Sequence, residues 1–477
     1  MTQLSYRPDD AMSLSRLGSP QPGVKEAARV PQRGATRLVP PLGCRRAPRR
    51  PPKSEAVLDN GLRVTAVRLP SVPMVEFRLH IPFAGDSTFF AACAQVLAST
   101  LLSGTQRLRG VALDDELARS GARVSTSLTP ERLSLHGNVL SENLLTLLDI
   151  LADVLTGALH DDGPVAAERE KRLRNAPLLA SSPAVFAAQA LRRHCYPDPP
   201  YTSDPPQESD FLELAGEDVR LLHRNAIVPR GSCLVLVGDL DPDRAVDDTS
   251  AVLSGWPDRE SSTVPTALPL LSGGELKVVD RPGSAQSQIR ICAQAVPRSD
   301  PRYPALHIAN TVFGGYFSSR LVENIREDKG YAYSIDSGFS STFEGSTLFL
   351  AMDVANGNTA PALLETMYEA GRISLIPPEE SEVEAARHYA SGSLNTWMGV
   401  QSYLATSLSN ISFLGLDIHW LYELQRRLGE VALDEVAEAA SQYLAPPRFT
   451  GVVVGEADRI TPLLRRLSDF RVTGASG

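Results

Sequence analysis

The chain has 477 residues, more than one hydrophobic core usually accommodates, so at least two domains are expected. Hydrophobic and charged contents of 43% and 22% are typical of a globular protein, and the net charge of −9 argues against nucleic-acid binding. The longest apolar run, LLTLLDILADVL, is interrupted by Asp149 and Asp153, so no membrane span is expected. Five cysteines, an odd number without a C-x-x-C pair, argue against a disulfide framework and indicate a reducing compartment.

The first 54 residues differ in charge from the remainder. They carry 11 Lys or Arg and 3 Asp or Glu, a balance of 11 − 3 = +8, whereas the remainder has 36 − 53 = −17. This segment is also rich in proline (APRRPP, VPPLG), which predicts a disordered extension over 1–54. It lacks the apolar stretch of a secretory signal, and its prolines do not suit a mitochondrial transit helix. A flexible extension of a bacterial cytoplasmic protein is the favoured interpretation, with a mitochondrial matrix protein as the alternative.

Strands and helices alternate along the next 200 residues or so. The segment LRVTAVRL follows Asn60-Gly61 and predicts a strand. The segment CAQVLASTLLSGT, residues 93–105, predicts a buried helix because its apolar residues recur at i, i+3, i+4, i+7 and i+8. Two strands, RVSTSLT and RLSLHGNVL, and the helix ENLLTLLDILADVL follow.

The second half repeats this organisation after a linker rich in Ser, Pro and Gly. LAGEDVRLLHRNAIVPRGSCLVLVGD, residues 214–239, and VALDEVAEAASQYLAPPRFTGVVVGE, residues 431–456, each predict a helix, a turn and a strand, at an offset of 217. The strand ELKVVD opens the second half, and strands YAYSIDSGF and STLFLAMDV precede long helices from 360 to 442. The predicted fold class is α+β, with homologous domains over 55–256 and 274–477 joined by the linker 257–273.

Four segments carry a resemblance to a known family: LDNGLRV, LLSGT, VVDRPGSAQSQI and FGGYFSSRLVENIREDKGYAYSI. The chain resembles the pitrilysin, or insulinase, family of zinc metallopeptidases in its mitochondrial-processing-peptidase-like branch, over about residues 56–470. The resemblance implies two tandem α/β-sandwich domains that make half of a clamshell around a peptide.

Active members of this family carry the inverted zincin motif H-x-x-E-H on the first buried helix, which this chain lacks. Alignment on Gly104-Thr105 places the two histidine ligands on Gln95 and Ser99, and the glutamate base on Ala98. The third ligand of the family falls near Asn175, where no acidic residue stands. None of the eight histidines has another four residues away. Gln and Ser are poor zinc ligands and Ala has no proton acceptor, so we expect this chain to bind no zinc.

The resemblance also places a substrate-binding pair on Arg326 and Tyr333, in the segment IREDKGYAY. In active members these two residues hold the scissile carbonyl, where a lost donor costs roughly 10²–10³ in rate. Arg326 should end a helix, Gly330 should permit a turn and Tyr333 should begin a strand, so that both side chains face one cavity. The alternative is structural: Arg326 pairs with Glu323 or Glu327, and Tyr333 packs.

Three other features of the sequence give weaker evidence of function. Gly314-Gly315 lies in no G-x-x-x-x-G-K-[ST] pattern, and backbone clearance at a helix start explains it better than phosphate binding. RVSTSLT stands where the family presents an edge strand to its substrate. His194 and Cys195 are neighbours in the chain, and such neighbours seldom bind one metal, so a surface or loop position is expected.

The leading functional hypothesis is a catalytically incomplete subunit of a two-component zinc endopeptidase that processes peptides. A homologous partner with intact H-x-x-E-H would hold the zinc, and this chain would supply Arg326 and Tyr333. The second hypothesis is a structural or peptide-binding pseudopeptidase that needs neither residue. A third, an independent peptidase with a novel metal site, predicts zinc in the purified single chain.

Overall fold

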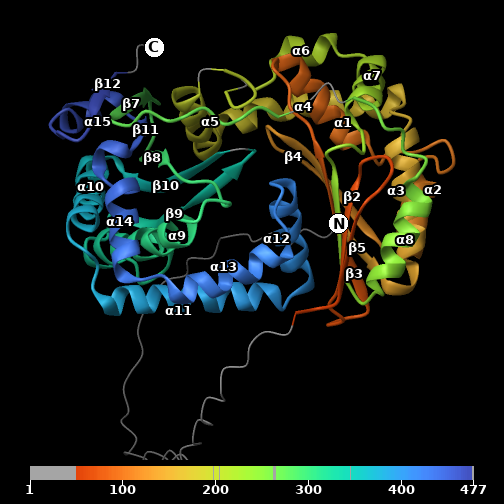
Figure 1. Cartoon of the computed structure of the whole chain (residues 1–477). Coiled ribbons are helices and arrows are strands. Elements are labelled where there is room, and N and C mark those ends of the chain that lie inside the picture. The colour runs from red at the N-terminus through yellow and green to blue at the C-terminus, as the bar shows by residue number, and fades with distance from the viewer. Residues whose placement is uncertain (1–49, 197, 203–204, 261–264, 344, 475–477) are drawn as a thin grey trace, which may run out of the picture. The chain divides into compact units, whose positions relative to one another are not determined.

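The computed structural model describes residues 50–474 except 197, 203–204, 261–264 and 344. Most of the predicted basic extension therefore lies outside the described residues. Strand β1 begins at Lys53, so the last two residues of the predicted disordered segment are in regular structure. The described residues form two six-stranded sheets, one in each half of the chain (Figure 1). This mixed architecture confirms the predicted α+β class.

The first sheet has the strand order β1-β2-β6-β3-β5-β4. Its central strand β6 is apolar at every position except its final glycine, and all six residues are buried. β6 runs parallel to β2 and antiparallel to β3, whereas β4 lies at an edge of the sheet. The strands are β1 (Lys53–Val57), β2 (Arg63–Arg68), β3 (Met74–Pro82), β4 (Arg123–Leu128), β5 (Arg132–Leu140) and β6 (Cys233–Gly238).

The second sheet repeats this arrangement, with the order β12-β7-β11-β8-β10-β9. Strand β11 takes the place of β6: it is fully buried, parallel to β7 and antiparallel to β8. Their first residues differ by 450 − 233 = 217, which is the repeat offset predicted from the sequence. The strands are β7 (Glu275–Asp280), β8 (Gln286–Gln294), β9 (Ala332–Thr342), β10 (Gly345–Ala355), β11 (Thr450–Gly455) and β12 (Arg471–Thr473).

The matching glycines at the ends of β6 and β11 permit the neighbouring segments of each sheet to approach the strand closely. A Cβ atom at Gly238 would lie 2.2 Å from the Met74 carbonyl oxygen, and one at Gly455 would lie 2.6 Å from Ser287 Oγ. A larger residue at either position would push neighbouring strands apart. The repeated glycine therefore has a steric cause in both halves.

Helices pack on each sheet, and apolar residues between these layers form the two main hydrophobic cores. In the first half the helices are α1 (Thr88–Thr100), α2 (Val111–Arg119), α3 (Leu144–Gly157), α4 (Asp162–Ser181), α5 (Pro183–Cys195), α6 (Glu208–Glu213), α7 (Gly216–Ala226) and α8 (Pro242–Leu253). In the second half they are α9 (Tyr303–Asn310), the π-helical segments η2 (Thr311–Gly315) and η3 (Val322–Asp328), α10 (Thr359–Leu375), α11 (Glu380–Met398), α12 (Gln401–Phe413), α13 (Ile418–Glu430), α14 (Leu433–Tyr443) and α15 (Ala457–Leu464). Short 3₁₀ turns are η1 (Ser141–Asn143), η4 (Asn356–Asn358) and η5 (Pro446–Arg448).

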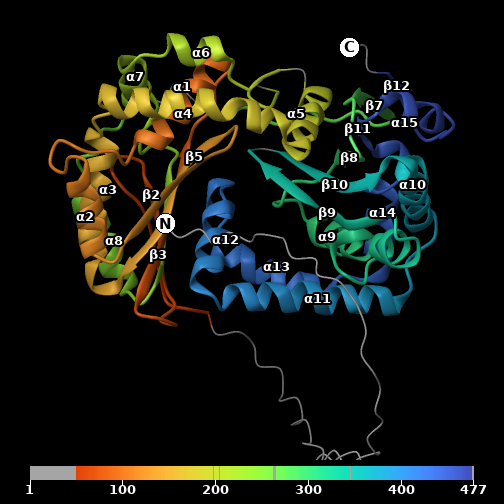
Figure 2. The ribbon, with the colours of Figure 1, turned by 180° about the vertical axis from the view of Figure 1, so that it is seen from behind.

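Each half contributes one helix to the sheet of the other half. Helix α12 packs on β3 and β6 of the first sheet, and α5 packs on β8 and β11 of the second (Figures 1 and 2). Hydrogen bonds support both contacts: Gln401 Nε2 of α12 donates to the Met74 carbonyl of β3 at 3.3 Å, and His194 Nε2 of α5 lies 2.8 Å from Thr450 Oγ1 of β11. The two halves are therefore joined by packed helices as well as by the linker.

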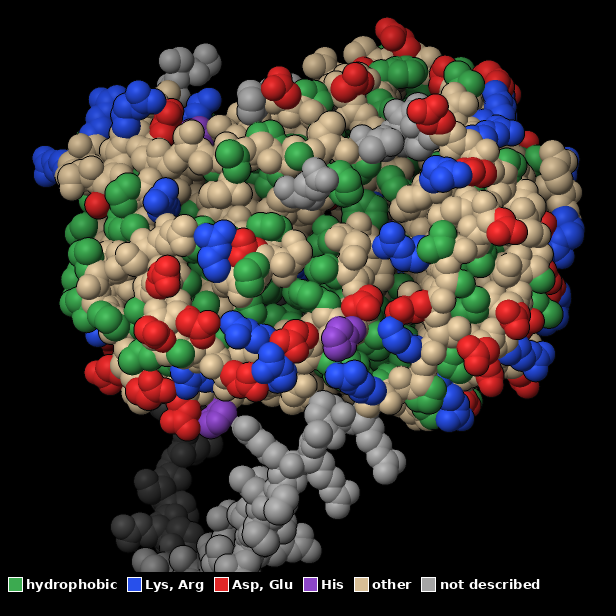
Figure 3. All heavy atoms as spheres, viewed as in Figure 1, with side chains coloured by type: hydrophobic (Ala, Val, Ile, Leu, Met, Phe, Trp, Pro, Cys, Tyr) green, Lys and Arg blue, Asp and Glu red, His purple; other side chains and the backbone are tan. Residues whose placement is uncertain are grey.

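The charged residues lie mainly at the surface. Figure 3 shows Asp and Glu side chains gathered at the lower left of one face, in the region of α11, whose first turn carries Glu380 and Glu382. In the part of the chain that the structure describes, no helix combines the length and the apolar character that crossing a bilayer requires.

Candidate functional site

Helix α1 carries the positions where the family resemblance places the metal ligands. Ser87 caps this helix by accepting a hydrogen bond from the Phe90 amide, and α1 then continues to Thr100. Gln95 is partly exposed and Ser99 is exposed, one turn apart on the same face, whereas Ala98 is buried. A buried helix is confirmed here, but it begins at Thr88 and ends at Thr100 instead of covering residues 93–105, and the two substituted ligand positions lie beside each other.

An arginine from α4 contacts both of these positions. Arg172 Nη2 donates to Ser99 Oγ at 2.7 Å, and its Nη1 lies 3.5 Å from Gln95 Oε1. The same guanidinium donates through Nε to Glu168 Oε1 at 2.8 Å. A cationic side chain therefore lies against the face of α1 that carries Gln95 and Ser99.

Glu168 is the carboxylate that faces this cluster. Its burial opposes ionisation, but hydrogen bonds from Lys171, Ser99 and Arg172 outweigh that effect and hold its pKa below the usual value. Asn175, the position closest to the family's third ligand in the alignment, is exposed on α4. The family alignment placed the third ligand near Asn175, so the sequence did not single out Glu168 or Arg172.

The residues present do not fit a zinc ion. Zinc requires several neutral nitrogen or anionic ligands, whereas this cluster offers one carboxylate, an amide and a hydroxyl, together with a guanidinium. A bound cation would have to displace Arg172 from Glu168 against charge repulsion. Among the described residues, no group of three or more His, Cys, Asp or Glu side chains is arranged to hold a metal ion.

A chain of buried hydrogen bonds extends from the end of α1. Thr100 Oγ1 lies 2.7 Å from His160 Nδ1, and His160 Nε2 lies 2.9 Å from His223 Nδ1. The other ring nitrogen of His223 lies 3.0 Å from the Leu155 carbonyl oxygen. Burial, with smaller contributions from His223 and Arg220, lowers the pKa of His160 to about 3. Both rings therefore serve as neutral hydrogen-bonding links between helices.

We expect His160 to make the protein less stable in acid. Between pH 6.5 and about pH 3, His160 is protonated in the unfolded chain but neutral in the native protein. The free energy of unfolding therefore decreases as the pH is lowered through this range. For one group the slope is about 1.4 kcal/mol per pH unit. Asn is a suitable replacement because it tolerates the positive φ of 46° at this position. The His160→Asn variant should show a smaller change in the free energy of unfolding with pH. Urea unfolding at pH values from about 7.5 to about 4.5 measures it.

The exposed His419 provides the matched control. The His419→Asn variant should keep the pH dependence of the wild-type protein, because its ring is not buried. If the free energy of unfolding of His160→Asn varies with pH as steeply as that of the wild type, these buried hydrogen-bonded histidines do not cause the acid sensitivity.

The predicted substrate-binding pair lies at the junction of η3 and β9. Arg326 is near the end of η3, Gly330 turns the chain with a φ of +62°, and Tyr333 is the second residue of β9. The Arg326 guanidinium carbon lies 5.6 Å from the centre of the Tyr333 ring and 5.2 Å from that of Phe317. The predicted helix, turn and strand are confirmed, and they bring the two side chains together.

Both side chains line a cavity of about 740 Å³. Tyr333 is 88% exposed, so it does not pack into the core as the structural alternative required. Arg326 does form the ion pair of that alternative, with Nε 3.2 Å from Glu327 Oε1, but both partners are at least one-third exposed. Such pairs contribute roughly 0–1 kcal/mol, which leaves the guanidinium available to another acceptor.

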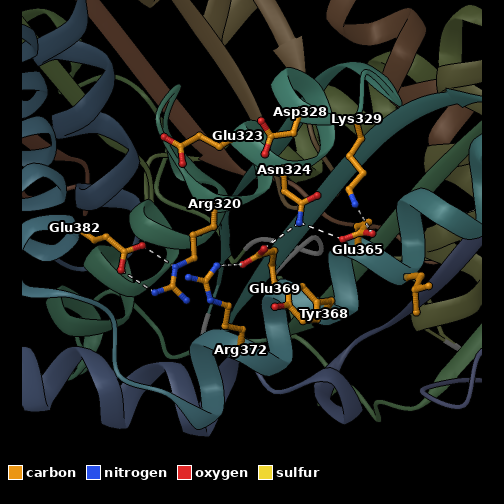
Figure 4. Close-up of a pocket in the computed structure, with 11 residues that line it drawn as sticks. Arg320, Glu323, Asn324, Asp328, Lys329, Glu365, Tyr368, Glu369, Arg372 and Glu382 are labelled. Carbon is orange, nitrogen blue, oxygen red and sulfur yellow. Dashed lines mark hydrogen bonds and ion pairs between the residues drawn. The ribbon is translucent and has the colours of Figure 1, made fainter.

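A polar network holds η3 from the side that faces α10 (Figure 4). Asn324 Nδ2 donates to Glu365 at 3.1 Å and to Glu369 at 2.9 Å, and Lys329 Nζ donates to Glu365 at 2.9 Å. The Lys329 hydrogen bond is the largest cause that holds the pKa of Glu365 below its usual value. Just before η3, Arg320 forms two 2.7 Å hydrogen bonds with Glu382 of α11. Both ends of the segment that carries Arg326 are therefore anchored.

The predicted edge strand is confirmed as β4, one of the two edge strands of the first sheet. Thr126 on β4 donates a hydrogen bond from Oγ1 to the Ala98 carbonyl at 2.8 Å, which ties this strand to α1. The corresponding edge strand of the second sheet is β9, which carries Tyr333. Each half thus has its candidate residues beside or on an edge strand.

The expectation of a loop position for His194 and Cys195 is wrong, although both side chains are partly exposed. Both lie in the last turn of α5, the helix that packs on the second sheet. His194 contacts Thr450 of β11, and Cys195 contacts Cys292 of β8. The sequence could not reveal these contacts, because their partners are 256 and 97 residues away.

Comparisons with known proteins agree with the duplicated fold. Residues 214–389, which include Arg326 and Tyr333, match the family described as the peptidase M16 inactive domain. The chain is 23% identical to an uncharacterized zinc protease of Streptomyces coelicolor over 61% of this chain and 65% of that protein, slightly less than two thirds of the relative. It is 22% identical to the uncharacterized zinc protease YmxG of Bacillus subtilis, over 80% of this chain and 94% of that protein.

Solved structures share the fold. The M16 inactive domain from Pseudomonas fluorescens aligns with a TM-score of 0.75 at 19% identity, over 85% of this chain and 98% of that one. A protease from Helicobacter pylori aligns with a TM-score of 0.77 at 16% identity, over 85% and 99% of the two chains. The class is thus a peptidase-like protein with two tandem α/β domains. Residues 214–389 thus belong to the M16, or pitrilysin, peptidase family as its inactive domain, and the full-length relatives are zinc proteases to which the chain is similar.

Proposed function

We propose that this chain is the zinc-less subunit of a heteromeric metalloendopeptidase that processes peptides in the bacterial cytoplasm, in the mitochondrial-processing-peptidase-like branch of the family. The observation that carries the proposal is the convergence of Arg326 and Tyr333 on one open cavity. On α1, by contrast, Gln95 and Ser99 face an arginine. A homologous partner with intact H-x-x-E-H would hold the zinc.

The contribution of this chain would be electrostatic. A guanidinium and a phenol are both hydrogen-bond donors, and both suit a peptide carbonyl oxygen that gains negative charge during hydrolysis. The anchored η3 segment fixes the backbone of Arg326 before substrate binds, so little reorganisation is needed. The free edge of β4 supports binding of an extended peptide by strand addition.

Reconstitution tests the proposal directly. The chain and its H-x-x-E-H homologue from the same organism are purified separately and as a co-expressed pair, and each preparation is assayed against a library of extended peptides. We expect a stable complex that contains zinc and cleaves peptides, with little activity in either subunit alone.

Two results would contradict the proposal. A partner that cleaves equally well without this chain would favour the structural or peptide-binding pseudopeptidase. Zinc and peptidase activity in this purified chain alone would favour an independent enzyme with a different metal site.

A further inference from the structure

Two cysteine thiols lie in contact where the two halves of the chain meet. Cys195 ends α5, Cys292 lies on β8, and their sulfur atoms are 3.2 Å apart although 97 residues separate them in the chain. A disulfide requires a sulfur separation of about 2.05 Å, so the two sulfur atoms would have to approach by about 1 Å to form the bond. The packing of α5 on β8 therefore places two reduced cysteines in position to react with each other.

The pair also opens onto a cavity. Cys195 and Cys292 both line a cavity of about 530 Å³, together with apolar residues such as Leu191 and Phe349. Cys195 is partly exposed, whereas Cys292 is 4% exposed. The hydrogen bond to Cys195 and burial raise the pKa of Cys292. A small oxidant that entered the cavity would thus meet Cys195 first, with Cys292 behind it.

We infer that Cys195 and Cys292 form a reversible redox site that takes a small peroxide as oxidant and joins the two halves by a disulfide. The Cys195 thiolate attacks one peroxide oxygen, which breaks the O–O bond, forms a sulfenic acid and releases hydroxide. The Cys292 sulfur then attacks the Cys195 sulfur, its proton passes to the departing hydroxyl group, and water leaves. Overall two thiols lose two electrons and two protons, and one hydrogen peroxide becomes two waters.

The disulfide would change the mechanics of the molecule. It would attach the end of α5, which belongs to the first half, to β8, which belongs to the second half. The linker 257–273 and the packing of α5 and α12 already connect the halves, and a covalent bond here would add a further restraint on their relative motion. This inference does not depend on the proposed peptidase role.

Mass spectrometry on the full chain tests the site. The reduced protein is treated with a small molar excess of hydrogen peroxide, remaining thiols are alkylated, and the digest is searched for a Cys195–Cys292 cross-link. We expect loss of two free thiols, a cross-linked peptide that dithiothreitol abolishes, and a rise in Tm of roughly 5 °C.

Variants separate this site from other thiol chemistry. Cys195→Ser changes the more exposed member and should abolish both the cross-link and the Tm shift, whereas Cys93→Ala removes a buried cysteine elsewhere and should preserve both. The wild-type cross-link is decisive even if a variant folds poorly. Peroxide treatment that leaves both thiols free, or that oxidises Cys195 without forming the cross-link, would overturn the inference.

Discussion

In the reconstituted pair, replacing Arg326 by Ala is expected to lower kcat/KM for peptide cleavage by roughly 10²–10³-fold, because the transition state loses a charged donor. Tyr333→Phe removes only a hydroxyl group from an exposed ring and should lower the rate by the same order or less. The fold should survive the Arg326 change, since its ring contacts and its exposed ion pair each contribute about 1 kcal/mol or less.

Controls come from similar residues outside this cavity. Tyr368 is 59% exposed on α10, and the side chain of Arg459 is 72% exposed on α15, so Tyr368→Phe and Arg459→Ala should leave kcat/KM unchanged. Wild-type cleavage by an Arg326→Ala and Tyr333→Phe double variant, in a complex that still assembles, would exclude the split-site hypothesis and support a structural role.

Replacing Arg172 by Met is expected to destabilise the protein by about 2–3 kcal/mol. The change removes hydrogen bonds to Ser99 and Glu168 and leaves the Glu168 carboxylate, 10% exposed, with only the more exposed Lys171 as a charged partner. Urea unfolding at neutral pH measures the loss. The effect should shrink in acid, because Glu168 becomes neutral and no longer needs a cation.

Arg174 on the same helix is the matched control. Its side chain is 68% exposed and lies 3.5 Å from an equally exposed Glu170, so Arg174→Met should change stability by less than about 0.5 kcal/mol. Equal effects of the two variants would contradict a special role for Arg172.

Metal binding gives a second test of the same cluster. Histidines introduced at Gln95 and Ser99 should bind zinc weakly while Arg172 is present. They should bind it more tightly after Arg172→Ala, because Glu168 can then serve as the third ligand. Zinc affinity that is indifferent to Arg172 would show that the guanidinium does not compete with a cation.

Much of the fold could be predicted because the sequence shows its repeat. The runs CLVLVG and TGVVVG, rich in β-branched residues, each after a helix and at a fixed offset, predicted the two central strands. The turn at Gly330 could also be anticipated, because glycine adopts positive φ without strain. These features depend on nearby residues, which periodicity and turn chemistry can describe.

The contact of Arg172 with Gln95 and Ser99 on α1 could not be predicted in the same way. Arg172 and Glu168 are separated by one helical turn, a spacing that usually indicates only a surface ion pair. Their contact with Ser99, 73 residues earlier, depends on how α4 packs against α1. The contact of Cys195 with Cys292 likewise depends on α5 crossing to the second sheet. Tertiary packing creates these sites, and local sequence patterns do not encode it.

The packing of α5 and α12 on the sheet of the opposite half has a consequence for folding during biosynthesis. The first sheet is complete in sequence once β6 ends at Gly238, but the helix that packs on β3 and β6 ends only at Phe413. During translation, the face of β3 and β6 that α12 covers must therefore wait for more than a third of the chain to be synthesised, whereas the opposite face packs on helices of the first half. Exposed strands of this kind are prone to aggregate. The nascent chain should consequently depend on chaperones until α12 has emerged from the ribosome.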